Sequence, residues 1–360
     1  MVSSVPPPAD AVESRRSGRR RVRRRRSCVR NVVAATSFTL LVPTIGPTSP
    51  ALASARDVDD GAATSTAAPG STARTSAPPR SAGYFGLRPV GAWSRLPSGS
   101  QCRTRVHQST WEPRPVNRKR NHQMPNGRAV HRSLAKRPRN TDNTYDRRWD
   151  HWLMRRVAGH YTATTDEIFQ WAACKWGLPD NVLRAIAVRE STWYQYLTYP
   201  SGGCVSNWGC GDLVSEPTHA TRVYCDGLAR VGGYDYQKDY GAGICPKTFS
   251  IVGVMSWENP HWGKMAGNQN GTFPFNRRST AFAVDYISAY LRGCYEGWVH
   301  WLDNTGTRNY SAGQLWGCVG SWYAGAWRDR AARGYIHRVR TELRNRTWLR
   351  SGWASNKPFS

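Results

Sequence analysis

One carboxylate occupies a position where the helical pattern calls for an apolar residue. Residues 182–193, VLRAIAVRESTW, predict a helix whose apolar stripe includes Ile186. Glu190 follows Ile186 by four residues and lies on the same stripe. It is either a solvated carboxylate pairing with Arg184 or Arg189 near a helix end, or an acid held among apolar groups. Burial raises the pKa of a carboxyl, which a general acid needs in order to protonate a glycosidic oxygen near neutral pH.

A second segment, FSIVGVMSWENPHWG, predicts a tight turn within a region rich in glycine and aromatic residues. Ser250 precedes this turn, Gly253 and Met255 form it, and Ser256 and Trp257 follow it. Aromatic rings in such a region either pack in the core or stack on the apolar faces of sugars. Three tryptophans of the region are candidates for stacking: Trp208, Trp257 and Trp262.

A third segment, GCVGSWYAGAW, places Tyr323 at a corner between two glycines. Glu190-Ser191 on a helix, the Gly-aliphatic-Met turn and the Tyr-small-Gly corner occur in that order along the chain. Together they resemble the lysozyme-like transglycosylases, in particular the branch of soluble lytic transglycosylases and goose-type lysozymes found in secreted bacterial proteins. The resemblance extends over residues 165–348. It implies a mainly α fold, a lysozyme-like helical domain with a long, loop-rich, disulfide-bonded insert.

The resemblance also implies an activity, cleavage of the β-1,4 bond between N-acetylmuramic acid and N-acetylglucosamine in peptidoglycan. Glu190 would be the general acid and base, and the Tyr323 hydroxyl would bind near it. Glu190 would protonate the bridging oxygen and then deprotonate the sugar's own 6-hydroxyl, leaving an anhydro-muramyl end, with no cofactor and no metal. The expected substrate-binding residues are Ser191, Ser250, Gly253, Met255, Ser256 and Trp257.

The chain departs from the family pattern at two places. One extra residue separates Ser250 from Gly253, and Ser256 stands where the family has Gln. Ala324 follows Tyr323, where Asn is common. Both changes remove an amide that could orient the sugar, so a catalytically weak glycan-binding module on the same fold stays open as an alternative.

Hydrolysis by a lysozyme-type muramidase is the other alternative, since Glu190 could deprotonate water instead of the sugar hydroxyl. A second carboxylate would then help to hold the water. The sequence offers five candidates, all of which could equally be solvated loop carboxylates: Asp212, Glu216, Asp235, Asp239 and Glu258.

The elements that must position these residues are mainly helices. Apolar periodicity predicts a helix in each of several segments, with Thr165, Asp180 and Ser311 as N-caps of three of them. Residues 198–278 read as the loop-rich insert. The predicted helical segments are 146–160, 165–177, 180–193, 279–297, 311–322 and 326–349.

The N-terminal part of the chain has a different composition. Residues 1–55 have a basic stretch, an apolar stretch and small residues in the order of a secretory signal peptide, too short and proline-interrupted for a stable membrane span. Residues 56–140 read as a disordered basic linker, residues 141–352 as the transglycosylase domain and residues 353–360 as a tail.

The distribution of charge bears on partners and localisation. Residues 161–360 hold 21 Lys and Arg against 15 Asp and Glu, so most of the net charge of +27 lies before them. A mildly basic domain does not favour specific nucleic-acid binding, whereas a basic linker favours an anionic surface. We therefore expect a monomer that is secreted and associates with peptidoglycan glycan strands and the anionic cell wall.

Eight cysteines follow residue 55, an even number that suggests disulfides in an exported chain. Cys204 and Cys210 are close enough in sequence for a small-loop bridge. The other pairings stay open, because eight cysteines allow 105 connectivities. The spacings lack the paired pattern of a zinc site.

Overall fold

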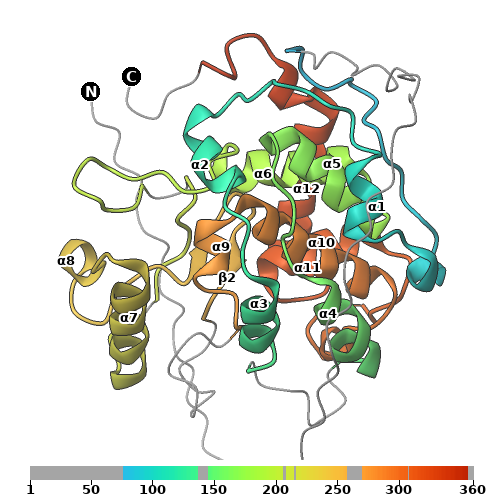
Figure 1. Ribbon diagram of the computed structural model, residues 1–360. Coiled ribbons are helices and arrows are strands. Elements are labelled where there is room, and N and C mark those ends of the chain that lie inside the picture. Colours follow the sequence, from blue (N-terminus) through green and yellow to red (C-terminus); the bar gives the residue numbers. More distant parts are fainter. Residues whose placement is uncertain are drawn as a thin grey trace, which may run out of the picture. The chain divides into compact units, whose positions relative to one another are not determined.

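The computed structural model describes most of the chain after residue 75, and all described residues belong to one compact unit, Pro69–Ser360 (Figure 1). The predicted signal peptide, residues 56–75 of the predicted linker, and Glu258 and Trp262 lie outside the described residues. The described ranges are 76–136, 145–205, 208–214, 216–257, 270–306 and 308–355.

The described chain is mainly helical, as predicted. Its two-residue strands β1 (Thr248–Phe249) and β2 (Val254–Met255) pair antiparallel around a turn. The α-helices are α1 (Gly99–Arg103), α2 (Arg118–Asn121), α3 (Gly127–Leu134), α4 (Met154–Arg156), α5 (Thr165–Trp176), α6 (Asp180–Ser191), α7 (His219–Gly232), α8 (Gln237–Tyr240), α9 (Phe275–Arg278), α10 (Thr280–Tyr295), α11 (Leu315–Ala324) and α12 (Arg330–Asn345). Shorter helical turns are η1 (Ala92–Arg95), η2 (Pro115–Asn117), η3 (Trp149–Leu153), η4 (His300–Asn304) and η5 (Thr347–Leu349). None of the helices in the described ranges is long and apolar enough to cross a membrane.

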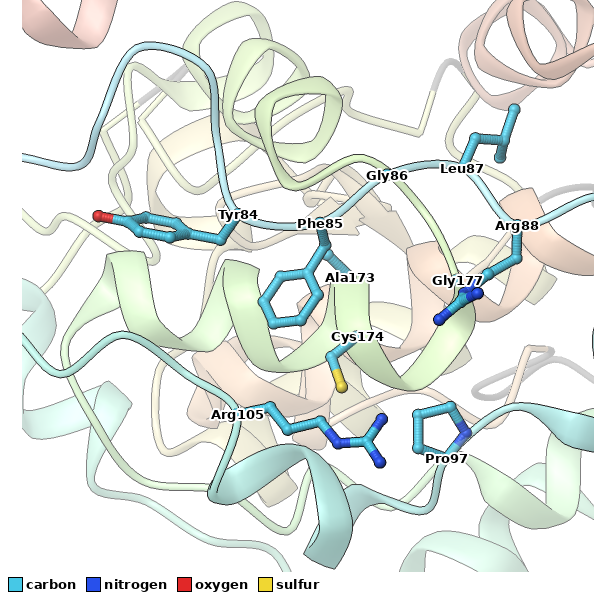
Figure 2. Close-up of a pocket in the computed structure, with 10 residues that line it drawn as sticks. All are labelled: Tyr84, Phe85, Gly86, Leu87, Arg88, Pro97, Arg105, Ala173, Cys174 and Gly177. Carbon is cyan, nitrogen blue, oxygen red and sulfur yellow. The ribbon is translucent and has the colours of Figure 1, made fainter.

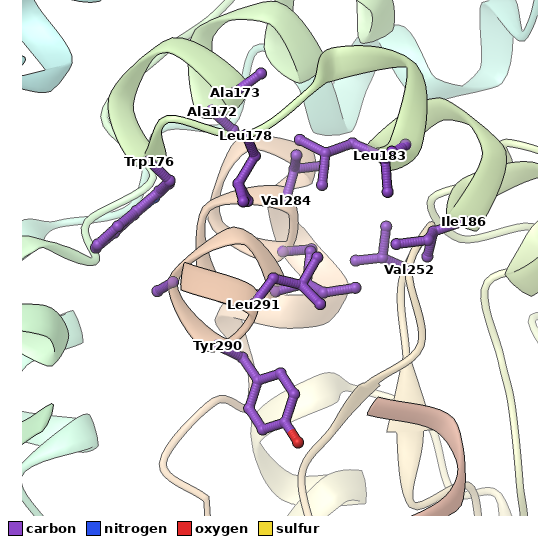
Figure 3. Packing of buried hydrophobic residues seen from close by; sticks show 14 of the residues in the cluster. Ala172, Ala173, Trp176, Leu178, Leu183, Ile186, Val252, Val284, Tyr290 and Leu291 are labelled. Atoms are coloured by element: carbon purple, nitrogen blue, oxygen red, sulfur yellow. The ribbon is translucent and has the colours of Figure 1, made fainter. Parts of the chain in front are cut away.

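The core forms where α5, α6 and α10 pack together. Figure 3 shows Leu183 and Ile186 of α6 facing Val284 of α10 and Val252 of the β1–β2 turn. All four side chains are fully buried, and each such burial stabilises the fold by about 2 kcal/mol. The core therefore fixes the last turn of α6 against the β1–β2 turn.

The caps of three helices differ from the expected ones. Thr164, not Thr165, caps α5, because its hydroxyl accepts from the Glu167 N–H while the Glu167 carboxylate accepts from the Thr164 N–H. α11 begins at Leu315, so Ser311 is not its cap. Asp180 is the first residue of α6, and its side chain is used elsewhere.

The Asp180 carboxylate anchors the segment before α1 to the core. It accepts the backbone N–H groups of Tyr84 and Phe85 at 3.0 and 3.1 Å and pairs with the buried Arg184 at 2.5 Å. If the Asp180 side chain capped α6, it could not accept these two N–H groups. The predicted local cap is therefore replaced by a contact with a distant segment.

The expectation of a disordered linker does not hold for residues 76–136. This segment carries α1, α2 and α3, buries Val130 and Leu134 in the core, and is joined to α5 by the Cys102–Cys174 disulfide. Val130 and Leu134 lie four residues apart on α3, but the surrounding sequence is basic and rich in proline, which is why its composition resembles a linker.

The same segment also reaches the other end of the chain. The buried guanidinium of Arg114 donates to the carbonyl oxygens of Thr192 and Trp353 at 2.9 and 3.0 Å. The Trp353 ring is buried and packs edge-on against Trp193 at 5.1 Å. The ordered domain is therefore wider than residues 141–352 on both sides.

The insert is loop-rich, as expected, but it also contains the 14-residue helix α7. The buried rings of Tyr224, Tyr236, Phe249 and Trp257 form a small second core inside it. The Cys204–Cys210 pair is confirmed, and all eight cysteines after residue 55 pair. The remaining disulfides are Cys102–Cys174, Cys225–Cys245 and Cys294–Cys318.

Candidate active site

A cleft of about 230 Å³ opens where the end of α6, the β1–β2 turn, the insert, and helices α11 and α12 meet. Six of the residues selected from the sequence line it, the candidate second acid Asp212 among them, together with other residues from these elements. The lining residues are Arg189, Glu190, Gly209, Cys210, Gly211, Asp212, Thr248, Ser250, Gly253, Met255, Trp322, Tyr323, Tyr335 and Arg338.

Glu190 lies in the last turn of α6, immediately before a left-handed break at Thr192 and Trp193. Burial raises the pKa of Glu190 to about 7. The nearby charge of Asp212 raises this pKa further, whereas the Tyr335 hydroxyl and the two arginines of the cleft lower it. The carboxyl therefore exists in both protonation states near neutral pH, as a group that both gives and takes a proton must.

The tyrosine that binds Glu190 is Tyr335, not Tyr323. The Tyr335 side chain on α12 is 1% exposed, and its hydroxyl donates a hydrogen bond to Oε1 of Glu190. Its pKa is raised well above the ordinary tyrosine value by burial and by the Glu190 charge, so it stays a donor. Tyr323 is 53% exposed and lies flat on the Tyr335 ring, with centroids 4.6 Å apart and planes 2° apart. The hydroxyl that binds Glu190 is therefore that of Tyr335, and Tyr323 forms one wall of the same cleft.

The β1–β2 turn is fitted against Glu190. Gly253 has a φ of +66°, and a Cβ built on it would lie 2.5 Å from Oε2 of Glu190. The buried Ser191 hydroxyl donates to the Ile251 carbonyl oxygen at 2.9 Å, which joins α6 to the turn. Ser191 is therefore a link beneath the cleft and does not line it, whereas Ser250, Gly253 and Met255 do.

Replacing Gly253 by alanine should damage both stability and any chemistry of Glu190. The methyl group would strain a left-handed backbone and press on Oε2 of the carboxylate. We expect a loss of about 1–3 kcal/mol in the free energy of unfolding, measured in urea, and a larger relative loss of activity. Gly325 also has positive φ but has open space around its Cβ position, so Gly325→Ala is the matched control. Equal activity losses in the two variants would contradict the fit of Gly253 to Glu190.

Ser256 and Trp257 do not reach the cleft, contrary to prediction. Ser256 is fully buried, and its hydroxyl accepts from the Asn276 side-chain amide at 2.8 Å. The Trp257 ring is buried against Tyr224, with centroids 5.6 Å apart. Both belong to the internal packing of the insert, because the chain turns away from the cleft after Met255.

Trp208 is likewise not part of the cleft lining. Its ring is half-buried and stacks on Tyr194, with centroids 4.9 Å apart and planes 7° apart. Of the three tryptophans considered for sugar stacking, neither of the two described lines the cleft.

The structure separates the candidate second acids. Asp212 lines the cleft together with Glu190. Asp235 accepts the backbone N–H of Gln237, and Asp239 accepts the Tyr234 hydroxyl at 2.9 Å. Asp235, Asp239 and Glu216 are absent from the lining, so Asp212 is the described candidate that faces Glu190.

Tyr335, Arg338 and Trp322 are cleft residues that the sequence did not reveal. Tyr335 falls on the buried stripe of α12 with Ile336 and Val339, so its pattern is that of an ordinary core aromatic. Trp322 donates its indole N–H to the Val252 carbonyl oxygen at 3.0 Å, which holds α11 on the turn. No local pattern distinguishes these residues, because their roles arise from the packing of α11 and α12 against α6.

A second cavity of about 300 Å³ lies beside α5, between the segment before η1 and the loop after α1 (Figure 2). In Figure 2 the guanidinium group of Arg105 lies beside Pro97 and that of Arg88 beside Gly177. Its lining contains no aspartate, glutamate or histidine and therefore no ready proton donor. General acid chemistry is assigned to the Glu190 cleft for this reason.

Within the part of the chain that the structure describes, no group of three His, Cys, Asp or Glu residues is placed to hold a metal ion. Comparison of the chain with protein-family models, curated proteins and solved structures gives no match. The chemistry of the Glu190 cleft is therefore the basis for assigning a function.

Proposed function

We propose that this protein is an exported peptidoglycan lytic transglycosylase with a lysozyme-like helical domain, acting on the β-1,4 bond between N-acetylmuramic acid and N-acetylglucosamine. One observation carries the proposal. A carboxyl with its pKa raised to about 7, that of Glu190, faces a cleft and is held by a buried tyrosine hydroxyl. Glu190, the Gly253 turn and the Tyr323 corner follow one another along the chain in the order of the lytic transglycosylase pattern, which supports the same assignment.

The reaction follows from the two protonation states of Glu190. The protonated carboxyl donates its proton to the glycosidic oxygen as the bond to the muramic acid C1 breaks. The resulting carboxylate then accepts the proton of the 6-hydroxyl of the same sugar, whose oxygen bonds to C1. The Tyr335 hydroxyl orients the carboxyl and stabilises its ionised form between the two steps.

Hydrolysis is the second candidate, and the position of Asp212 in the cleft favours it. An inverting hydrolysis needs a second carboxylate to activate water on the opposite face of the sugar. In that reaction water replaces the 6-hydroxyl, and the product carries a reducing end.

The four disulfides support export, since such bonds persist in oxidising compartments. The basic residues between positions 56 and 160, which follow the predicted signal peptide, support attraction to an anionic cell wall. The described cleft contains all the groups that the proposed reaction uses, which supports a monomer as the active form.

Digestion of purified sacculi by the oxidised protein, with mass spectrometry of the released ends, tests the proposal. We expect anhydro-muramyl ends, each lighter than a reducing end by one water, and Asp212→Asn should still produce them. Reducing ends that disappear in Asp212→Asn would reassign the protein as a muramidase. Binding to sacculi without release of soluble fragments would make it a glycan-binding module.

A further inference from the structure

Two arginines flank Glu190 in the cleft. Arg189 comes from α6 and Arg338 from α12, and both line the cavity. Neither forms an ion pair or hydrogen bond with a carboxylate among the residues placed by the structure, although Asp212 lines the same cavity. Two cations left without an acidic partner beside one cavity provide a site for an anionic group.

Arg338 is held in place by aromatic rings. Its guanidinium lies over the Tyr323 ring at 5.6 Å and near the Tyr335 ring at 6.0 Å. Its Nε is buried and has no hydrogen-bond partner among the residues that the structure describes, so the two rings are its described contacts. The stacked rings fix the guanidinium before any ligand arrives, which reduces the entropy lost on binding.

We propose that Arg189 and Arg338 form a subsite for a carboxylate of the peptide stem that muramic acid carries next to the scissile bond. This inference rests on the proposed function, because it takes the glycan to occupy the same cleft. A guanidinium matches the planar geometry of a carboxylate and can form two parallel hydrogen bonds with it. A neutral glycan without stem peptides offers no such group. The subsite therefore selects stem-bearing peptidoglycan over chemically similar neutral polymers.

Occupation of this subsite also affects the acid. Four groups bear on the Glu190 carboxyl: Arg189 of α6, Asp212 of the insert, and Tyr335 and Arg338 of α12. A bound stem carboxylate offsets the two arginine charges, which lower the Glu190 pKa in the free protein. Substrate binding is thus expected to favour the protonated acid that starts the reaction.

Calorimetric binding of the disaccharide-peptide GlcNAc-MurNAc-peptide to the intact protein tests the subsite. This fragment lacks the scissile bond, so binding is scored without turnover. Three ligands are compared: the fragment with free carboxylates, the same fragment with its carboxylates amidated, and the disaccharide without peptide, whose lactyl carboxyl is amidated so that it carries no charge. For wild type we expect Kd to rise about tenfold on amidation, as for loss of one charge-assisted hydrogen-bonded pair.

Arg338→Gln and Arg189→Gln should each weaken binding of the free-carboxylate fragment about tenfold and leave binding of the amidated fragment and of the amidated disaccharide unchanged. Arg344→Gln, an exposed arginine of the same helix outside the cleft, is the matched control and should bind like wild type. Equal binding of all three ligands by wild type, no detectable binding of any, or equal weakening toward all three by the arginine variants, would each overturn the subsite. Sacculus digestion decides the proposed function separately. If the protein cleaves sacculi but binds the fragment independently of its carboxylates, the subsite is rejected and the proposed function stands. If it binds the fragment through its carboxylates but does not cleave sacculi, the proposed enzymatic activity is rejected and the arginine site stands.

Discussion

Glu190→Gln is expected to release soluble fragments from sacculi about 10³-fold more slowly than wild type. Glutamine keeps the size of the side chain and can still accept the Tyr335 hydrogen bond, but it cannot donate a proton to a leaving oxygen. General acid and base catalysis contributes about 10²–10⁴-fold, so loss of a residue that does both belongs toward the upper part of this range. The measurement is the initial rate of fragment release at equal protein concentration, with circular dichroism to confirm folding. Release by the variant at the wild-type rate would rule out Glu190 as the acid.

The pH dependence of the wild-type rate provides a second check on the same residue. Because the reaction starts from protonated Glu190 and the pKa of Glu190 is about 7, kcat/KM should level off below about pH 6. Above pH 7 it should fall about tenfold per unit. A rate that stays constant to pH 9 would show that the group acting as acid has a different pKa.

The raised pKa also predicts how Glu190→Gln changes stability. The carboxyl of the unfolded chain loses its proton near pH 4.5, whereas the folded protein keeps it until about pH 7. Between these values the folded state binds more protons, so the wild-type free energy of unfolding falls as pH rises and levels off above pH 7. The total decrease is up to about 3 kcal/mol. Glutamine does not ionise, so the variant does not lose this free energy of unfolding as pH rises. The melting temperature of Glu190→Gln should therefore be several degrees above that of wild type at pH 8 and close to that of wild type at pH 4. Equal melting temperatures at both pH values would contradict burial of the charged carboxylate.

The parts of the site that the sequence predicted depend on local patterns. Glu190 is recognisable because it interrupts an apolar stripe, and the residues of that stripe join Val252 and Val284 in the core (Figure 3). Gly253 was recognisable because a glycine between aliphatic residues indicates a turn, and its φ of +66° explains why. Helix periodicity and turn chemistry act over a few residues, so one sequence is enough to reveal them.

The parts that the sequence missed depend on packing between distant segments. Tyr335 lies 145 residues from Glu190 and carries the pattern of a core aromatic, whereas Tyr323 has the more conspicuous glycine-flanked context. Ser256 and Trp257 continue a correctly identified turn, but the chain enters the small core of the insert after Met255. Only the three-dimensional path of the chain distinguishes these residues from cleft residues.

The ordered segment before residue 137 was missed for a related reason. Its links to the domain are a disulfide from Cys102, backbone N–H groups bound by Asp180 and a buried guanidinium at Arg114. None of these produces apolar periodicity, and eight cysteines do not disclose their own pairing. A basic, proline-rich composition therefore concealed a segment that packs on the core.

Tyr335→Phe is expected to lower kcat about 10–100-fold, and the matched variant Tyr323→Phe should change it less than about threefold. The Tyr335 hydroxyl is the described donor to Oε1 of Glu190, and loss of one donor to a charged group in a cleft removes about 2–3 kcal/mol of stabilisation. Phenylalanine at Tyr323 keeps the ring that stacks on Tyr335 and loses only a hydroxyl on an exposed side chain.

The two tyrosine variants also differ in their pH profiles, which separates a positioning role from simple loss of packing. The Tyr335 hydrogen bond lowers the pKa of Glu190, so its removal should raise that pKa and move the alkaline fall of kcat/KM to higher pH. Tyr323→Phe should leave the profile in place. A lower rate with an unmoved profile would mean that Tyr335 supports the cleft only by packing, and a shifted profile in Tyr323→Phe would return the role to the tyrosine that the sequence suggested. The outcome therefore decides whether Tyr335 of α12 controls the pKa of Glu190 through its hydrogen bond or only packs beside the cleft.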